Sequence, residues 1–150
     1  GYYEFDTKIL HGLFNELVDY VETELSHTMK TYKDRDYKFN NGRCKQAGLD
    51  YLDWASSLKM GTDFNLDHDD PDYNKPTRQA ISAQTIKDLY LWWTEIRPNR
   101  LDPLDLYDRI EHNKRKTLDR IKLNNIEEMY TNEDTDMLIH LISIRQDIWC

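Results

Sequence analysis

The amino-acid sequence predicts an all-α fold, an irregular bundle of about five helices that forms a single domain over residues 1–150. Apolar side chains recur at spacings of three and four residues in several segments, which is the period of a helix with one buried face. Glycine and proline, which punctuate turn-rich β-proteins, number only 5 and 4. The chain is also long enough to bury a hydrophobic core without disulfides.

Residues 75–104 are expected to contain the central helix, because this segment carries the broadest apolar face and two adjacent tryptophans. We predict that the helix begins near Pro76 and Thr77 and ends by Arg97, since Pro98 disfavours helical geometry in the residue before it. The predicted buried face comprises Ser82, Thr85, Ile86, Leu89, Trp92, Trp93 and Ile96, with Ile81 and Tyr90 at its margins.

Residues 4–30 form the longest periodic segment and predict the first helix. Its apolar stripe comprises Leu10, Leu13, Phe14, Leu17, Val18, Val21, Leu25 and Met29. Glu24 falls within this stripe, and a carboxylate in an apolar environment needs a partner. Arg145 lies in the apolar face of the last predicted helix, so we predict a buried ion pair between Glu24 and Arg145.

The other predicted elements alternate between helices and polar connections. Residues 31–41 are interpreted as a connection, and residues 42–58 as a second helix with apolar side chains on two faces. Residues 59–74 form a long acidic loop, a kind of segment that is often functional in a compact domain. Residues 103–130 predict a fourth helix, and Asn132 is expected to cap the fifth and last one.

The net charge of −8 at pH 7 argues against binding to nucleic-acid backbones or to an anionic membrane surface, and favours either solubility or a basic partner. No apolar run approaches the roughly 20 residues that span a bilayer, and no signal peptide opens the chain. We therefore expect an intracellular protein. Cys44 and Cys150 lack metal-ligand spacing, and we expect them to be reduced thiols.

Four segments carry a resemblance to known proteins: ILHGLFNELVDYVETEL at residues 9–25, AGLDYLDW at 47–54, LYLWWTEIRPNRLDP at 89–103 and EDTDMLIHLISIRQDIW at 133–149. Together they cover most of the chain, and their combination resembles a family of uncharacterised tailed-bacteriophage proteins of unknown function. The resemblance implies a phage origin but no activity, cofactor or site residue. It also implies that an N-terminal extension precedes Gly1.

Five acidic side chains suggest an alternative function, a divalent-metal-dependent nucleotide phosphohydrolase. All-α nucleotide pyrophosphatases hold Mg²⁺ with acids on facing helices, because a hard cation prefers several oxygen ligands. The Glu-Glu-x-x-Glu and Glu-x-x-Asp patterns of those enzymes are absent here. Solvated helix faces are the simpler interpretation, and the alternative would place Mg²⁺ or Mn²⁺ at Glu16, Asp19, Glu22, Asp50 and Asp53.

The acidic loop is a candidate surface for a protein partner. Asp67, Asp69 and Asp70 surround His68, but the segment lacks the alternating ligands, central glycine and final glutamate of a calcium loop. We interpret it as a flexible acidic loop, with a weak cation site or a patch for a basic partner as the other possibilities.

A second candidate surface combines Trp92 and Trp93 with Arg97 and Arg100. Tryptophan and arginine are enriched in interface hot spots, and the same residue types can stack on a nucleotide base. The simpler interpretation is that both tryptophans pack in the core and an arginine binds the last carbonyls of the helix.

No nucleophile elbow, phosphate-binding glycine loop or catalytic cysteine setting is present, so we assign no catalytic residue, and no cofactor apart from the metal of the alternative. We expect a small acidic bacteriophage accessory protein that binds a host or virion protein, in the host cytoplasm or on the virion. An acidic surface that imitates nucleic acid toward a host factor is one form of this function. Convergence of the five acids on one concavity would favour the hydrolase instead.

Overall fold

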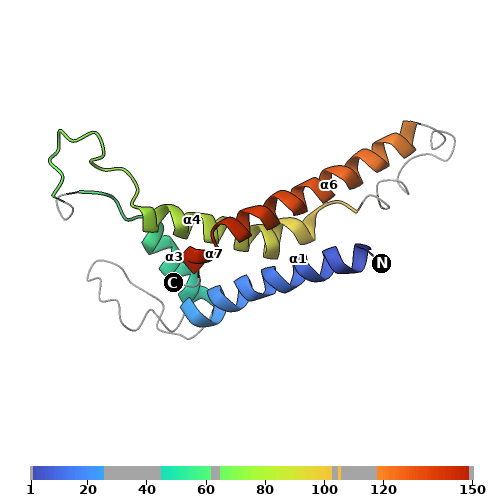
Figure 1. The fold of residues 1–150 in the computed structure, drawn as a ribbon, viewed down its shortest axis with the longest axis horizontal. Coiled ribbons are helices and arrows are strands. Elements are labelled where there is room, and N and C mark those ends of the chain that lie inside the picture. The colour runs from blue at the N-terminus through green and yellow to red at the C-terminus, as the bar shows by residue number, and fades with distance from the viewer. Residues whose placement is uncertain (1, 26–44, 62–64, 103–104, 106–117, 149–150) are drawn as a thin grey trace.

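The computed structural model describes residues 2–25, 45–61, 65–102, 105 and 118–148 (Figure 1). Every regular element within these residues is helical, and the one β-type pairing among them is an isolated bridge between Lys59 and Pro76. The predicted all-α fold class is therefore confirmed. The elements are α1 (Tyr2–Asp19), the π-helical turn η1 (Tyr20–Glu24), α3 (Lys45–Ser56), α4 (Arg78–Leu91), the π-helical turn η3 (Trp92–Ile96), the 3₁₀ turn η4 (Arg97–Asn99), α6 (Leu118–Ser143) and α7 (Arg145–Ile148).

α1 and η1 correspond to the first predicted helix. Its predicted apolar stripe supplies five buried side chains, which are Leu10, Phe14, Leu17, Val21 and Leu25. Met29 and the predicted connection at residues 31–41 lie outside the described residues. These five positions of the predicted stripe are thus buried as expected, because an apolar helix face is removed from water by packing on neighbouring helices.

α3 packs against both α4 and η1, in agreement with its two predicted apolar faces. Its closest approach to η1 is at Gly48, where an added Cβ would lie 1.9 Å from the backbone oxygen of Val21. Real Cβ atoms essentially never come within 3.0 Å of another heavy atom. Only glycine at this position allows the two segments to pack so closely.

α4 is the central helix, in contact with α3, α1 and α6. It begins as predicted: Thr77 is the N-cap, and its hydroxyl accepts a hydrogen bond from the Ala80 amide at 3.0 Å. Helical geometry then continues through η3 and η4 as far as Asn99, two residues beyond the predicted end. Pro98 is tolerated because it lies in the first turn of η4, where its missing N–H is not needed.

Two apolar positions in this segment differ from the prediction. Ile96 was assigned to the buried face but is 57% exposed, whereas Tyr90, placed at the margin, is completely buried. The π-helical turn from Trp92 onward explains the first difference. Its hydrogen bonds span one residue more than those of an α-helix, so side chains beyond it rotate away from a face projected at α-helical spacing.

α6 is a continuous helix of 26 residues, and the break predicted at Asn132 is absent. Residues 118–143 contain neither glycine nor proline. On either side of the predicted cap, the hydroxyls of Thr131 and Thr135 donate to the carbonyls of Glu127 and Thr131, at 3.0 and 2.9 Å, so these side chains bond to the backbone of the same continuous helix. Half of the predicted fourth helix, residues 103–104 and 106–117, lies outside the described part of the chain.

The predicted buried ion pair between Glu24 and Arg145 is wrong, because both side chains are exposed. The Arg145 guanidinium donates instead to the carbonyl of Ile142 at 2.8 Å. Two interruptions of helical register account for this. η1 rotates Glu24 out of the apolar stripe, and a turn at Ile144 separates Arg145 from the face of α6.

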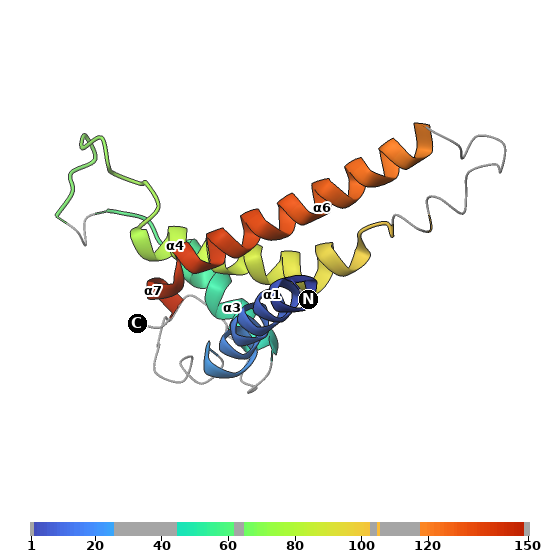
Figure 2. The same ribbon diagram turned by 45° about the vertical axis from the view of Figure 1, so that its right-hand side comes forward.

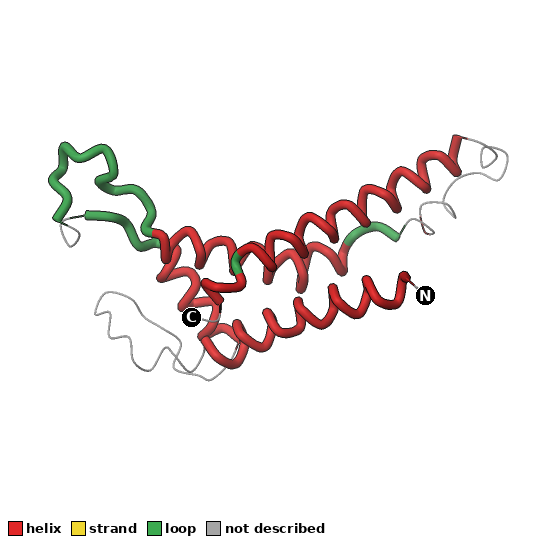
Figure 3. Tube along the Cα trace, viewed as in Figure 1, coloured by secondary structure: helices red, strands yellow, loops and turns green. Residues whose placement is uncertain are grey.

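The helices form an elongated arrangement in which α4 lies between α6 and the pair α1 and α3 (Figure 1). The first half of α6, drawn in orange, extends away from the other helices in both ribbon views (Figure 2). The loop between α3 and α4 extends from the opposite end (Figure 3). Among the described residues, none of the helices combines the length and apolarity that a membrane span requires.

Candidate functional site

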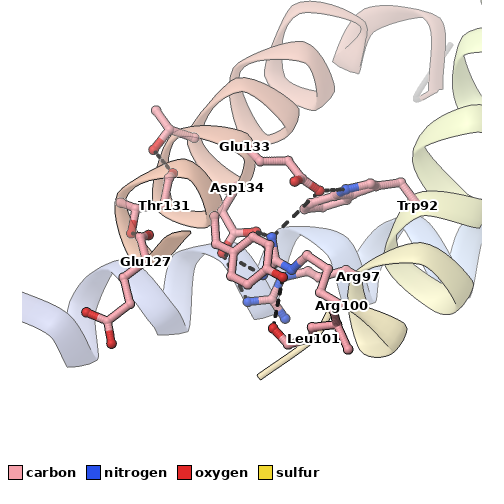
Figure 4. Close-up of polar contacts among 10 residues, drawn as sticks. Trp92, Arg97, Arg100, Leu101, Glu127, Thr131, Glu133 and Asp134 are labelled. Carbon is pink, nitrogen blue, oxygen red and sulfur yellow. Dashed lines mark hydrogen bonds and ion pairs between the residues drawn. The ribbon is translucent and has the colours of Figure 1, made fainter. Parts of the chain in front are cut away.

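The end of α4 is joined to the middle of α6 by a group of side chains that we call the α4–α6 cluster: Trp92, Arg97, Arg100, Glu133 and Asp134 (Figure 4). Arg97 Nε and Nη2 donate to the two carboxylate oxygens of Asp134 at 3.1 and 3.2 Å. Arg100 Nη1 and Nη2 donate to the same oxygens at 2.8 and 3.4 Å. Trp92 Nε1 donates to Glu133 Oε1 at 2.6 Å, and Arg100 Nη1 lies 3.7 Å from that oxygen.

The cluster holds Asp134 as an ionised carboxylate. Partial burial of this carboxyl opposes ionisation, but the hydrogen bonds and positive charges of Arg97 and Arg100 outweigh burial, so the pKa of Asp134 is lowered below its ordinary value. Two bidentate arginines on one carboxylate also fix its orientation. The result is a defined attachment of α6 to α4 at a point about midway along α6.

The same arginines rest on aromatic rings. The Arg97 guanidinium lies 5.0 Å from the ring centroid of Trp93, which in turn stacks on Phe14 at 4.8 Å. Trp92 is only 4% exposed, and Trp93 is half-buried. The structure therefore places Trp92, Trp93, Arg97 and Arg100 in contacts within the protein, and both arginines bind Asp134 instead of the last carbonyls of the helix.

The acidic loop has a defined path over its described residues. Backbone hydrogen bonds close its base, from Met60 N to Lys75 O at 2.8 Å and from Asn74 N to Met60 O at 2.7 Å. Asp67 and Asp69 are exposed at its far end. Asp70 is half-buried, and its Oδ1 accepts a hydrogen bond from the Asp72 amide at 2.8 Å, which forms an Asx turn.

Three of the five acids considered as metal ligands have partners elsewhere in the fold. Glu22 accepts a hydrogen bond from the Tyr90 hydroxyl at 3.0 Å, and burial together with this bond raises the pKa of Tyr90. Asp50 accepts from Gln46 at 2.8 Å, and Asp53 forms an ion pair with Lys87.

The other two, Glu16 and Asp19, are exposed on α1. Among the residues that the structure describes, no three His, Cys, Asp or Glu side chains are grouped so as to hold a metal ion. The five acids are thus not brought together on one concavity, the arrangement that would have favoured the hydrolase.

A small cavity of about 360 Å³ lies between α1, η4 and α6. The ion pair between Arg97 and Asp134 forms part of its wall, and Asp6 is the remaining charged side chain that lines it. The other lining residues are Thr7, Ile9, Leu10, Thr131, Thr135 and Leu138. A cavity with one unpaired carboxylate and no nucleophile–base pair offers no recognisable chemistry.

A shallow, open depression runs along one face of α6, and we call it the α6 groove. It has a volume of about 590 Å³ and is lined by Asn125, Glu128, Met129, Asn132, Glu133, Asp136 and Met137. These positions recur every three or four residues, so they form one face of the helix. Met129 is 56% exposed at its centre.

Sequence reasoning missed the α6 groove because its face is polar apart from two methionines, and apolar periodicity was the guide to importance. The sequence offered no signal of this groove, because Leu118, Ile121, Ile126 and Met129 share one face of the predicted helix and suggested a packed one. Comparison of this chain with known protein families, with curated proteins and with solved structures finds no match.

Proposed function

We propose that this chain is a small acidic accessory protein of a tailed bacteriophage, which acts without catalysis by binding a host or virion protein, in the host cytoplasm or on the virion. The phage origin rests on the resemblance of the four segments quoted above. The binding role rests on one observation, the exposure of the first half of α6 beyond the packed helices (Figures 1 and 2).

A helix of 26 residues is roughly 39 Å long, and most helices in proteins depend on the packing of one face for their stability. α6 packs through its second half, where Leu141 is buried and Asp134 is bound by two arginines. None of the described side chains from Lys122 to Tyr130 is buried. The helix is therefore held firmly at one end and presented to solvent at the other, which suits recognition by a partner.

An exposed apolar side chain supports the proposed binding role only if it lies on the solvent-exposed half of α6. Single exposed apolar residues are ordinary on protein surfaces, and Phe5, Ile81 and Leu101 are of this kind. Met129 is different, because it lies at the centre of the α6 groove. It is the side chain on which we expect partner binding to depend.

Affinity capture from an extract of infected cells tests the proposal. The bait is the tagged chain, compared with Met129→Gln and with the matched control Ile81→Gln, because the two side chains are 56% and 58% exposed. We expect the wild type and Ile81→Gln to retain the same partner, and Met129→Gln to retain about tenfold less, which corresponds to about 1.4 kcal/mol. Competition of the captured partner by DNA would identify the nucleic-acid-mimic form of the function.

Two results would contradict the proposal. One is capture no greater than with the tag alone, and the other is the same set of proteins at the same level with all three baits. Circular dichroism of both variants should match the wild type, because neither side chain belongs to the core.

A further inference from the structure

The α6 groove contains two apolar side chains at a spacing that matches another helix. Met129 and Met137 are eight residues apart, which is roughly 12 Å along the helix axis, or about two turns. Met129 is exposed, and the half-buried Met137 joins the groove to the packed part of the protein. Methionine is unbranched and polarisable, so it adapts to apolar side chains of different shapes. Helices that bind in grooves use apolar anchors at this kind of spacing.

The charges of the α6 groove indicate which charge a partner should carry. Among the described residues, its lining holds three carboxylates, from Glu128, Glu133 and Asp136, and no cationic side chain. Glu133 is partly neutralised by Trp92 and Arg100 of the α4–α6 cluster. Glu128 and Asp136 are exposed, and no ion pair with a described cation engages either carboxylate.

From this arrangement we infer that the α6 groove binds a basic amphipathic helix of the partner protein. That helix would place two large apolar side chains, two turns apart, on Met129 and Met137, with lysine or arginine beside Glu128 and Asp136. The inference rests on the proposed function and specifies the partner's chemistry. Complementary charge raises the association rate and excludes acidic competitors, and its effect weakens as salt is added.

A second copy of this chain is disfavoured as the occupant. Two α6 grooves placed face to face would bring the same three acids of each copy together, with no cation from the part of either lining that the structure describes. Like charges across an interface cost free energy and act as a barrier to the wrong partner. The occupant therefore has to supply the positive charge.

Fluorescence anisotropy with a labelled synthetic peptide tests the inference on the full chain. The peptide is helical, with leucines two turns apart on one face and lysines on both sides of them. One control peptide has the same composition in an order that scatters the leucines around the helix, and the other has glutamate in place of lysine. We expect saturable binding of the first peptide alone, weakened by added salt.

Two protein variants locate the site. Glu128→Lys/Asp136→Lys reverses both free charges of the groove and should weaken binding of the basic peptide at least about tenfold, while binding of the glutamate peptide appears. Glu127→Lys is the matched control, because Glu127 is exposed, adjacent in sequence and absent from the groove lining. It should change the affinity by less than about twofold.

The inference is overturned if the scattered peptide binds as tightly as the amphipathic one, if neither binds, or if the control and the double variant lose affinity equally. It is also overturned if light scattering shows a dimer of the wild type that Met129→Gln converts to a monomer, since a second copy would then fill the groove. The proposed function can survive such a failure. A partner captured from cells by Glu128→Lys/Asp136→Lys, but lost with Asp67→Asn/Asp69→Asn, would move the binding surface to the acidic loop.

Discussion

At the scale of single residues, the absence of a side chain at Gly48 determines how closely α3 and η1 can pack. The surface of η1 that meets α3 at this point is the carbonyl of Val21, and a carbonyl in a helix cannot move aside as the end of a flexible side chain can. The sequence showed Gly48 only as a glycine inside a predicted helix, where it weakens helix propensity. Its packing role depends on where η1 lies, which no local pattern encodes.

We predict that Gly48→Ala destabilises the protein although alanine is the better helix former. Propensity alone would favour the variant by about 1 kcal/mol, but a Cβ 1.9 Å from the Val21 oxygen forces the two segments apart, and overpacking of this kind costs about 1–3 kcal/mol. We therefore expect a net loss of up to about 2 kcal/mol in the free energy of unfolding, measured by urea denaturation.

Gly12→Ala is the matched control for this prediction. Gly12 is also inside a helix, but a Cβ there would have no heavy atom within 4 Å. Only the propensity effect remains, so this variant should be more stable than the wild type by up to about 1 kcal/mol. Equal stabilisation by both substitutions would show that α3 and η1 can separate freely.

At the scale of helices, most predicted elements correspond to observed ones, and the differences come from interruptions of regular geometry. The core stripe of α1 and the Thr77 cap follow from apolar spacing and capping chemistry, which are local properties. The π-helical turns could not be predicted from these local properties. Each turn changes the helical register and so rotates side chains such as Glu24 and Ile96 away from the predicted face. The continuity of α6 through Asn132 likewise depends on tertiary contacts, since Glu133 and Asp134 bind Trp92 of η3 and Arg97 of η4.

The attachment of α6 to α4 leads to a prediction about pH. Because the pKa of Asp134 is lower in the folded state than its ordinary value of 3.8, the ion pairs stabilise the folded protein at every pH above that value. This stabilisation is lost as pH falls below 3.8 through the lowered pKa, where the carboxylate becomes protonated. Asp134→Asn should therefore lower stability at neutral pH, by about 2 kcal/mol, which is typical of hydrogen bonds between charged groups.

Thermal unfolding of the wild type and Asp134→Asn between neutral and strongly acidic pH measures this effect. The two unfolding midpoints should differ most at neutral pH and converge in acid. Asp136→Asn serves as the control, because this acid lies two residues away and is exposed, and we expect it to follow the wild type at neutral pH. A constant gap between the wild type and Asp134→Asn at all pH values would show that the carboxylate charge is not what holds α6.

At the scale of the whole molecule, the acidic side chains are dispersed over several surfaces instead of converging on one. α1, the loop between α3 and α4, and the first half of α6 each carry exposed carboxylates. Such dispersion suits a protein whose surface attracts a basic partner. Composition gave the sign of the charge correctly, but the placement of each acid depends on how the helices pack, so the α6 groove could not be deduced from the sequence.

This dispersion predicts how the protein responds to metal ions. A cation that binds only the folded state raises the free energy of unfolding by RT ln(1 + [L]/Kd), about 2.7 kcal/mol at a hundredfold excess over Kd, and that would raise the unfolding midpoint by several degrees. Because Glu22, Asp50 and Asp53 are engaged with other side chains and no group of three ligands occurs among the described residues, we expect no such rise.

The measurement compares the unfolding midpoints in EDTA and in low-millimolar Mg²⁺ or Mn²⁺ at matched ionic strength. A rise of several degrees that Asp50→Asn removes would instead favour the phosphohydrolase, since Asp50 is one of the five acids that the alternative function would use as metal ligands.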